Sequence, residues 1–469
     1  MAHYFLDPFG CAKNQVDAET IMALLGKAGW SATENPAEAD LIIVNSCAFI
    51  ESAKRESLNA VFAWRKQYPG TKILLAGCLA QRYAAELSLS LPEADGLFGN
   101  TSLEGIAAAA AALVPDSTSG GESPPSLQTC TSFGLPLPPP PGGSAPKPPQ
   151  ALPGTRPLLS PPGSAYLKIS EGCNNRCSFC AIPLIRGPLR SRDITGISAE
   201  CRTLLDRGIR ELCVIGQDIA SFGDDRPDQG DLPALLEAIA AIPGHFWVRL
   251  LYLHPDRLPL SILDIMAADR RFLPYFDIPL QHASRPLLQA MNRRGDGEHY
   301  LDLIQKIRTT LPDAVIRSTF LVGFPGESED DFAQLLDFQE QAALDWAGCF
   351  TYSREENTPA YPMKNQVPRS LAAKRKRMLE ERQQGISEGR MERFVGRELE
   401  VLIEERFTNP EEGAGGLYLG RAYCQAPDVD GVSLVHSETE LIPGALIRCR
   451  VNGRAGFDLR LQPTAKADG

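Results

Sequence analysis

Three closely spaced cysteines, Cys173, Cys177 and Cys180, constrain this chain more than any other feature. They form a C-x3-C-x2-C pattern directly after a strand-like run at 166–170. Iron–sulfur clusters are usually held by four cysteines, and the next cysteine in the sequence, Cys201, lies well outside this loop. The three thiolates would therefore hold three corners of a 4Fe–4S cluster and leave one iron open to a substrate or cofactor.

Two other uses of these cysteines compete with the cluster. A structural zinc ion takes four protein ligands, commonly from paired C-x2-C units, and this loop offers three. A disulfide framework is typical of small secreted domains, whereas this chain has 469 residues and starts without a basic segment followed by an apolar run. The spacing favours the open cluster.

The same loop resembles the radical S-adenosylmethionine (SAM) enzymes, whose signature is C-x3-C-x2-C. The residues that follow it, from Ala181 through Arg186 to Arg192, are similar to one branch of that superfamily, the methylthiotransferases. This resemblance implies that SAM binds at the open iron of the cluster.

The composition indicates two or three ordinary globular domains, with 43% hydrophobic and 22% charged residues. No apolar run approaches the ~18 residues of a membrane span, so we expect a cytoplasmic protein without a membrane partner. A net charge of −11 argues against a general nucleic-acid binder, which usually has a basic surface, and suits a basic partner.

Residues 1–114 alternate strand-like and helix-like segments, which predicts a parallel-sheet α/β domain. Cys11, Cys47 and Cys78 each follow a strand-like run by a few residues. Ligands of open parallel sheets bind at the carboxyl ends of the strands, so we expect the three to converge on one edge. Each cysteine taken alone also fits a small buried apolar residue. The surrounding motifs resemble the methylthiotransferase N-terminal domain, which implies that the three hold a second 4Fe–4S cluster with one iron free.

The segment at 115–162 carries 15 of the 38 prolines, with many Gly and Ser residues. We predict a disordered, Pro-rich linker there. Residues 163–392 then alternate strand and helix six times, too few for a closed eight-unit barrel. We predict a partial (β/α)6 barrel of the radical SAM type.

Polar and glycine motifs follow the predicted strands of this barrel, at the end where barrel active sites lie. Among these residues we expect Gln217, Asp218, Gly323 and Gly326 to contact the cofactor, because glycine lets the backbone approach a nucleoside closely. The glycines also fit a simple turn into the next helix, and His282 also fits a structural histidine.

Residues 393–463 read as five short strands, with turns at Asp430-Gly431 and Asn452-Gly453, followed by a tail at 464–469. They predict a small antiparallel β-barrel that resembles the OB-like TRAM domain. Its eight arginines and eleven acidic residues give a net charge of −3. Direct nucleic-acid binding is therefore not expected, since a phosphate-binding barrel needs excess cations.

Several motifs, Ile215 to Asp218 and Tyr275 to His282 among them, resemble the methylthiotransferase branch that modifies an aspartate of ribosomal protein S-twelve. This implies a SAM-derived radical that removes hydrogen from the aspartate β-carbon, and sulfur supplied through the second cluster. It also implies two partners, protein S-twelve or the small ribosomal subunit and an electron donor such as flavodoxin or ferredoxin. The alternatives are a transfer-RNA adenosine methylthiotransferase and a non-catalytic iron–sulfur protein.

Overall fold

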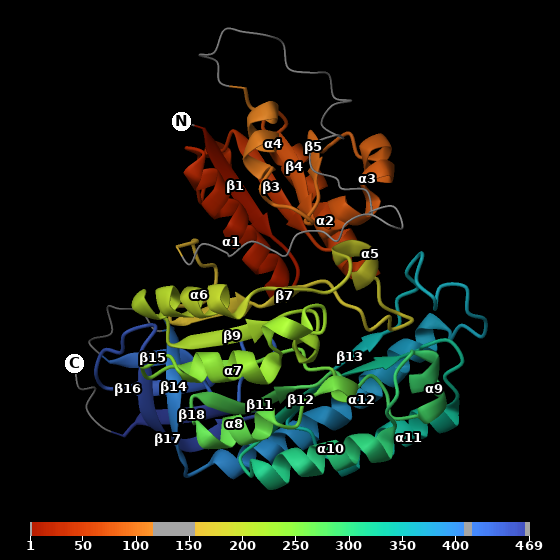
Figure 1. Cartoon of the computed structure of the whole chain (residues 1–469), viewed down its shortest axis with the longest axis vertical. Coiled ribbons are helices and arrows are strands. Elements are labelled where there is room, and N and C mark those ends of the chain that lie inside the picture. Colours follow the sequence, from red (N-terminus) through yellow and green to blue (C-terminus); the bar gives the residue numbers. More distant parts are fainter. Residues whose placement is uncertain (1, 116–154, 408–414, 465–469) are drawn as a thin grey trace.

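The computed structural model describes residues 2–115, 155–407 and 415–464. Figure 1 shows an N-terminal α/β body above a larger central sheet, with a small barrel beside the sheet. No helix of the described residues is long and apolar enough to cross a membrane.

The N-terminal domain is a five-stranded parallel sheet in the order β2-β1-β3-β4-β5. Every residue of its central strand, Leu41–Ser46, is buried, as expected where helices cover both faces of a parallel sheet. The strands are β1 (His3–Pro8), β2 (Ser31–Ala32), β3 (Leu41–Ser46), β4 (Lys72–Gly77) and β5 (Gly96–Phe98). The helices are α1 (Ala12–Lys27), α2 (Glu51–Gln67), α3 (Cys78–Ser90) and α4 (Ile106–Leu113).

The central domain confirms the six predicted strand–helix units. Its strands pair in parallel in the order β13-β12-β11-β10-β9-β6, so that β6 and β13 are the two edges of an open, partial barrel. The strands are β6 (Ser164–Lys168), β9 (Glu211–Ile215), β10 (Trp247–Leu250), β11 (Phe272–Asp277), β12 (Val315–Val322) and β13 (Trp346–Thr351).

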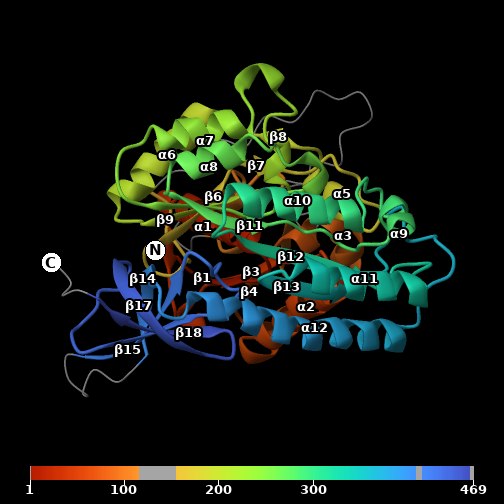
Figure 2. The same cartoon turned by 90° about the horizontal axis from the view of Figure 1, so that it is seen from below.

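Helices cover the outside of this sheet. They are α6 (Ile194–Asp206), α7 (Leu232–Ala240), α8 (Ile262–Ala268), α9 (Arg285–Ala290), α10 (Gly297–Thr310) and α11 (Glu329–Ala342). The 23-residue helix α12 (Arg369–Met391) packs on β13 and runs on to the small barrel, as Figure 2 shows. A short hairpin of β7 (Ser170–Glu171) and β8 (Arg190–Ser191) brackets the cysteine loop and the one-turn helix α5 (Ile182–Arg186).

The C-terminal domain is the predicted closed five-stranded barrel. Its strands are β14 (Glu398–Arg406), β15 (Gly416–Ala422), β16 (Ser433–Ser437), β17 (Leu446–Ala455) and β18 (Asp458–Pro463). Two details differ from the sequence-based prediction. The barrel is not wholly antiparallel, because β16 and β18 pair in parallel to close it. Asn452-Gly453 is not a turn either, because a bulge absorbs it within β17 and the chain turns at Gly456.

The predicted linker at 115–162 falls mostly outside the described residues, and its last part differs from the prediction. Residues 155–162 pack against both flanking domains, and Arg156 is fully buried. Its guanidinium pairs with Glu19 of α1 at 2.8 Å and with Glu200 of α6. Two carboxylates thus compensate the buried cation and fix this segment, which Pro and Gly content alone does not reveal.

Candidate metal centre

The three N-terminal cysteines lie at the carboxyl ends of three neighbouring strands. Cys11 caps α1 just after β1, Cys47 follows β3, and Cys78 opens α3 directly after β4. The turns leading to them are tight. A Cβ atom on Gly77, whose φ is +93°, would lie 2.7 Å from Asn45 Oδ1, so only glycine fits there.

Polar groups surround the most buried of these sulfurs, Cys78 Sγ. The side-chain amide of Asn100 donates to it at 3.2 Å, and the guanidinium of Arg186 donates at 3.4 Å. Burial raises the pKa of the Cys78 thiol to about 12. The apo thiol is therefore protonated at neutral pH, and a metal would have to displace that proton.

Cys11 differs from Cys78 in its electrostatic surroundings. Desolvation raises its pKa, but the neighbouring charges of Lys13 and Arg186 outweigh this effect and bring the pKa below the ordinary value. A lower pKa favours the thiolate, which is the form that binds metals.

The second set, Cys173, Cys177 and Cys180, lies in the irregular loop between β7 and α5. The loop starts at Gly172, where a Cβ atom would lie 2.0 Å from the carbonyl oxygen of Pro188. It then turns so that the amide of Cys180 donates to the carbonyl of Cys177 at 3.0 Å. Burial raises the pKa of Cys173 to about 11 and that of Cys180 to about 12.

Both sets suit an iron–sulfur cluster by the chemistry of their donors, since each consists of three cysteine sulfurs. In a 4Fe–4S cube each thiolate binds a different iron atom, so the sulfurs stand further apart than around one ion. Thiolates are the usual ligands of such clusters, and each set provides three of them.

A buried ionic network joins the two cysteine sets. Arg186, six residues after Cys180, pairs with Asp17 of α1 at 2.8 Å and with Glu171 at 2.6 Å. Lys168 pairs with the same two carboxylates at 2.5 and 2.8 Å. The four residues are at most 5% exposed. Together with the contact from Arg186 to Cys78, this network fixes the N-terminal cysteines relative to the cysteine loop.

Of the residues predicted to contact the cofactor, Gln217 retains an open hydrogen-bonding group. Its Nε2 donates to Glu171 at 3.2 Å, while its buried Oε1 has no partner among the described residues. Asp218 is fully engaged within the protein. Its carboxylate accepts from the side chains of Asn175 and Ser221 and from the amides of Ala220 and His254.

The structure accounts for the two glycines by packing and turn geometry. A Cβ atom on Gly323, whose φ is +75°, would lie 2.5 Å from the Cβ of Ala372 in α12. Gly326 has a φ of +89°, and its amide donates to the carbonyl of Asn365 at 2.9 Å. The nearby His282 is fully buried and 3.7 Å from Glu327. These contacts fit the alternative interpretation, in which the two glycines form a turn and His282 is a structural histidine.

Sequence reasoning missed Lys13, which the fold brings to the carboxyl ends of the strands of the central sheet. Its ammonium lies 3.2 Å from the ring centroid of Tyr252, just past β10. Tyr252 has a φ of 67°, an unusual conformation for an aromatic residue that recurs at functional sites. The only signal in the sequence was the position of Lys13 beside Cys11.

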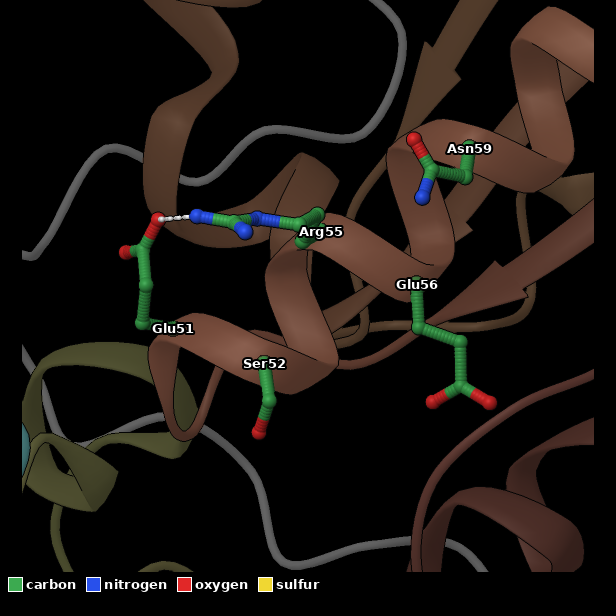
Figure 3. A pocket seen from close by; sticks show the side chains of 5 residues that line it. All are labelled: Glu51, Ser52, Arg55, Glu56 and Asn59. Atoms are coloured by element: carbon green, nitrogen blue, oxygen red, sulfur yellow. Dashed lines mark ion pairs between the residues drawn. The ribbon is translucent and has the colours of Figure 1, made fainter.

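A hollow of about 470 Å³ on the outer surface of α2 is unrelated to the cysteines. Figure 3 shows it lined by Glu51, Ser52, Arg55, Glu56 and Asn59, with Glu51 and Arg55 paired. All five side chains are polar and come from one helix, and no cysteine is among them. We therefore exclude it from the candidate site.

Comparison with known proteins divides the chain into three regions. Residues 3–99 match the "Uncharacterized protein family UPF0004", residues 167–338 the "Radical SAM superfamily" and residues 395–462 the "TRAM domain". Three curated relatives have the same description, "Ribosomal protein uS12 methylthiotransferase RimO". They come from Treponema denticola (44% identical, covering 97% of this chain and 99% of the relative), Aquifex aeolicus (40%, 98% and 96%) and Clostridioides difficile (38%, 97% and 97%).

Among solved structures, the radical S-adenosylmethionine methyltransferase TsrM from Kitasatospora setae is similar in fold. The TM-score is 0.55 at 14% sequence identity, over 77% of this chain and 74% of that chain. At this identity the likeness supports the arrangement of the N-terminal and central domains and nothing finer.

Proposed function

Because the chain belongs to the RimO family of radical SAM methylthiotransferases, we propose that it attaches a methylthio group to the β-carbon of an aspartate in ribosomal protein uS12. The cofactors of this family are SAM and 4Fe–4S clusters. The observation that carries the proposal is the pairing of two three-cysteine sets through one buried ionic network.

Each set has its own assignment. Cys173, Cys177 and Cys180 would hold the cluster that binds SAM, while the set of Cys11, Cys47 and Cys78 would hold the second cluster. When bound, these groups supply the electron that cleaves SAM and the sulfur that is inserted, chemistry that amino-acid side chains cannot provide.

Side chains of the protein would position the clusters and SAM and shield them from water. Gln217, with its open Oε1 beside Glu171, is our candidate for a hydrogen bond to SAM. Asp218 would act indirectly, because its four accepted hydrogen bonds fix the cysteine loop through Asn175 and the next strand end through His254. His254 itself stays neutral, because burial and the charges of Arg293 and Arg257 lower its pKa to about 3.

Charge in the terminal barrel supports a protein substrate over transfer RNA. Arg421, one of its eight arginines, is buried against Glu211 of the central sheet at 2.5 Å. Arg397 pairs with Asp313 at 2.9 Å, and Arg454 pairs with Glu392 at 2.7 Å. These arginines are thus engaged with carboxylates of the chain. The barrel also has a net charge of −3, which suits a basic ribosomal protein better than RNA.

We place the reaction in the cytoplasm, where ribosomal proteins are made and assembled. A flavodoxin or a ferredoxin is our proposed electron donor, since these proteins supply single electrons at low potential.

Anaerobic turnover tests the proposed function. The reconstituted full-length chain is incubated with SAM, a reductant and purified uS12, and intact-mass and fragment spectra are recorded. We expect one added methylthio group on one aspartate, and none with the Cys173→Ala variant. The proposal would be refuted if uS12 stayed unmodified and an adenosine of added transfer RNA gained the methylthio group.

A further inference from the structure

Lys13 is a buried cation whose charged neighbour within the chain is the thiolate of Cys11 rather than a carboxylate. The residue is only 7% exposed. Its ammonium forms no ion pair with a carboxylate of the described residues. The other buried cations nearby, Lys168 and Arg186, each pair with two carboxylates. A buried cation that lacks a carboxylate partner is costly, so a carboxylate brought to Lys13 would be stabilised there.

The position of Lys13 limits which anion can reach it. It follows Cys11 by two residues at the start of α1, the helix that Figure 1 shows reaching down to the central domain. Its ammonium faces the ring of Tyr252 at the carboxyl end of the central sheet. An anion bound there would therefore lie between the N-terminal cysteines and the SAM side of the site.

Tyr252 gives this position a fixed wall. Its amide donates to Asp277 at 3.1 Å, and its carbonyl accepts from the amide of Ile219 at 3.0 Å. The ring attracts the ammonium through a cation–π contact, but a neutral ring does not cancel a full charge.

The thiolates of the N-terminal set are the competing counter-ion. Arg186 already donates to Cys78, yet Arg186 is itself neutralised by Asp17 and Glu171. A structural role for Lys13 would therefore be to balance cluster charge. That role predicts an effect on the cluster and no effect on the choice of substrate, which allows a direct test.

We propose that the Lys13 ammonium binds the side-chain carboxylate of the substrate aspartate and so makes the enzyme specific for aspartate. This inference rests on the proposed function. The carboxylate of aspartate is bonded to the β-carbon, so binding it at Lys13 brings the carbon that is modified close to Cys11 and its partners. A neutral amide or a nucleobase would leave Lys13 without its counter-ion.

The test compares substrate discrimination in matched variants. Binding to the reconstituted full-length enzyme with SAM is measured for uS12 and for uS12 whose modified aspartate is changed to asparagine. The variants are Lys13→Met, Lys13→Arg and, as a control, Lys27→Met at the exposed far end of α1. Iron content and the reduction potential of the N-terminal cluster are recorded for each.

We expect wild type and Lys27→Met to bind the aspartate form roughly tenfold or more tightly than the asparagine form. Lys13→Met should bind both forms equally, and Lys13→Arg should keep part of the preference. In turnover, Lys13→Met should raise KM for the aspartate form more than it lowers kcat.

Two results would overturn the inference, and they are distinguishable. If Lys13→Met keeps the wild-type preference, with or without a shift in cluster potential, Lys13 does not bind the carboxylate although the proposed function stands. If the wild-type enzyme neither binds nor modifies uS12, the proposed function fails and this inference fails with it.

Discussion

Replacing Asp17 with asparagine should destabilise the contact between the N-terminal and central domains. Asp17 lies on α1 and accepts ion pairs from Lys168 at 2.5 Å and Arg186 at 2.8 Å. With Glu171, the site holds two cations and two carboxylates. Removing one carboxylate leaves a net positive charge in a place that water cannot reach.

The expected loss is about 3–5 kcal/mol in the free energy of unfolding, the usual cost of breaking a buried ion pair from one side. Asparagine has nearly the same size as aspartate, so little of this loss comes from packing. The control is Asp224→Asn, which removes an ion pair of 2.6 Å between side chains that are 42% and 51% exposed. Exposed pairs of this kind contribute at most about 1 kcal/mol.

Urea unfolding of the full-length chain measures the loss, and amide hydrogen exchange in α1 locates it. A double variant, Asp17→Asn with Lys168→Met, provides the internal check. Removing the stranded lysine should recover part of the lost stability, because the cost arises from an uncompensated charge rather than from a missing attraction. Equal losses for Asp17→Asn and Asp224→Asn, or no recovery in the double variant, would refute the reasoning.

Three further outcomes are expected. By metal analysis, the Cys11→Ala variant should lose about four iron atoms per chain while it still cleaves SAM. The control variant, Cys201→Ala, changes a buried cysteine of the core and should lose no iron. Gln217→Ala should weaken SAM binding roughly tenfold in an equilibrium binding assay. The control variant, Gln289→Ala at an exposed position, should bind SAM as tightly as the wild type. Burial raises the pKa of Asp430 from 3.8 to about 6, so the folded chain binds more protons between these values. Stability should therefore fall by up to roughly 3 kcal/mol as pH rises across that window, and Asp430→Asn should remove this fall in urea titrations.

The architecture was predictable because its signals are local. Runs such as Leu41 to Val44 and Lys72 to Leu75 are mostly apolar over a strand's length, and each became part of a strand of a parallel sheet. The cysteine positions were predictable for the same reason, since a short turn ties Cys11, Cys47 and Cys78 to the ends of their strands. Neighbouring strands then bring them to one edge.

The contacts between domains were not predictable, because they join residues far apart in sequence. Arg156 was assigned to a linker, since its neighbours are Pro and Gly, yet it lies fully buried between Glu19 and Glu200. The carboxylate of Asp218 accepts hydrogen bonds from side chains and amides of the loops around it, which the sequence does not reveal. Ionic partners can be assigned only once the fold is known.

These contacts explain how one chain can hold two metal sites in fixed relation. A second, partly buried set of ion pairs also joins the two domains. There Glu355, after β13, pairs with Lys54 at 3.1 Å and Arg82 at 2.6 Å from the N-terminal domain. Buried ion pairs add little net stability, but they are directional and a misplaced pair is costly. An interface built from them has one favourable register. Lys13 lies in the same interface and pairs with no carboxylate of the described residues, which is why we assign a carboxylate of the substrate to it.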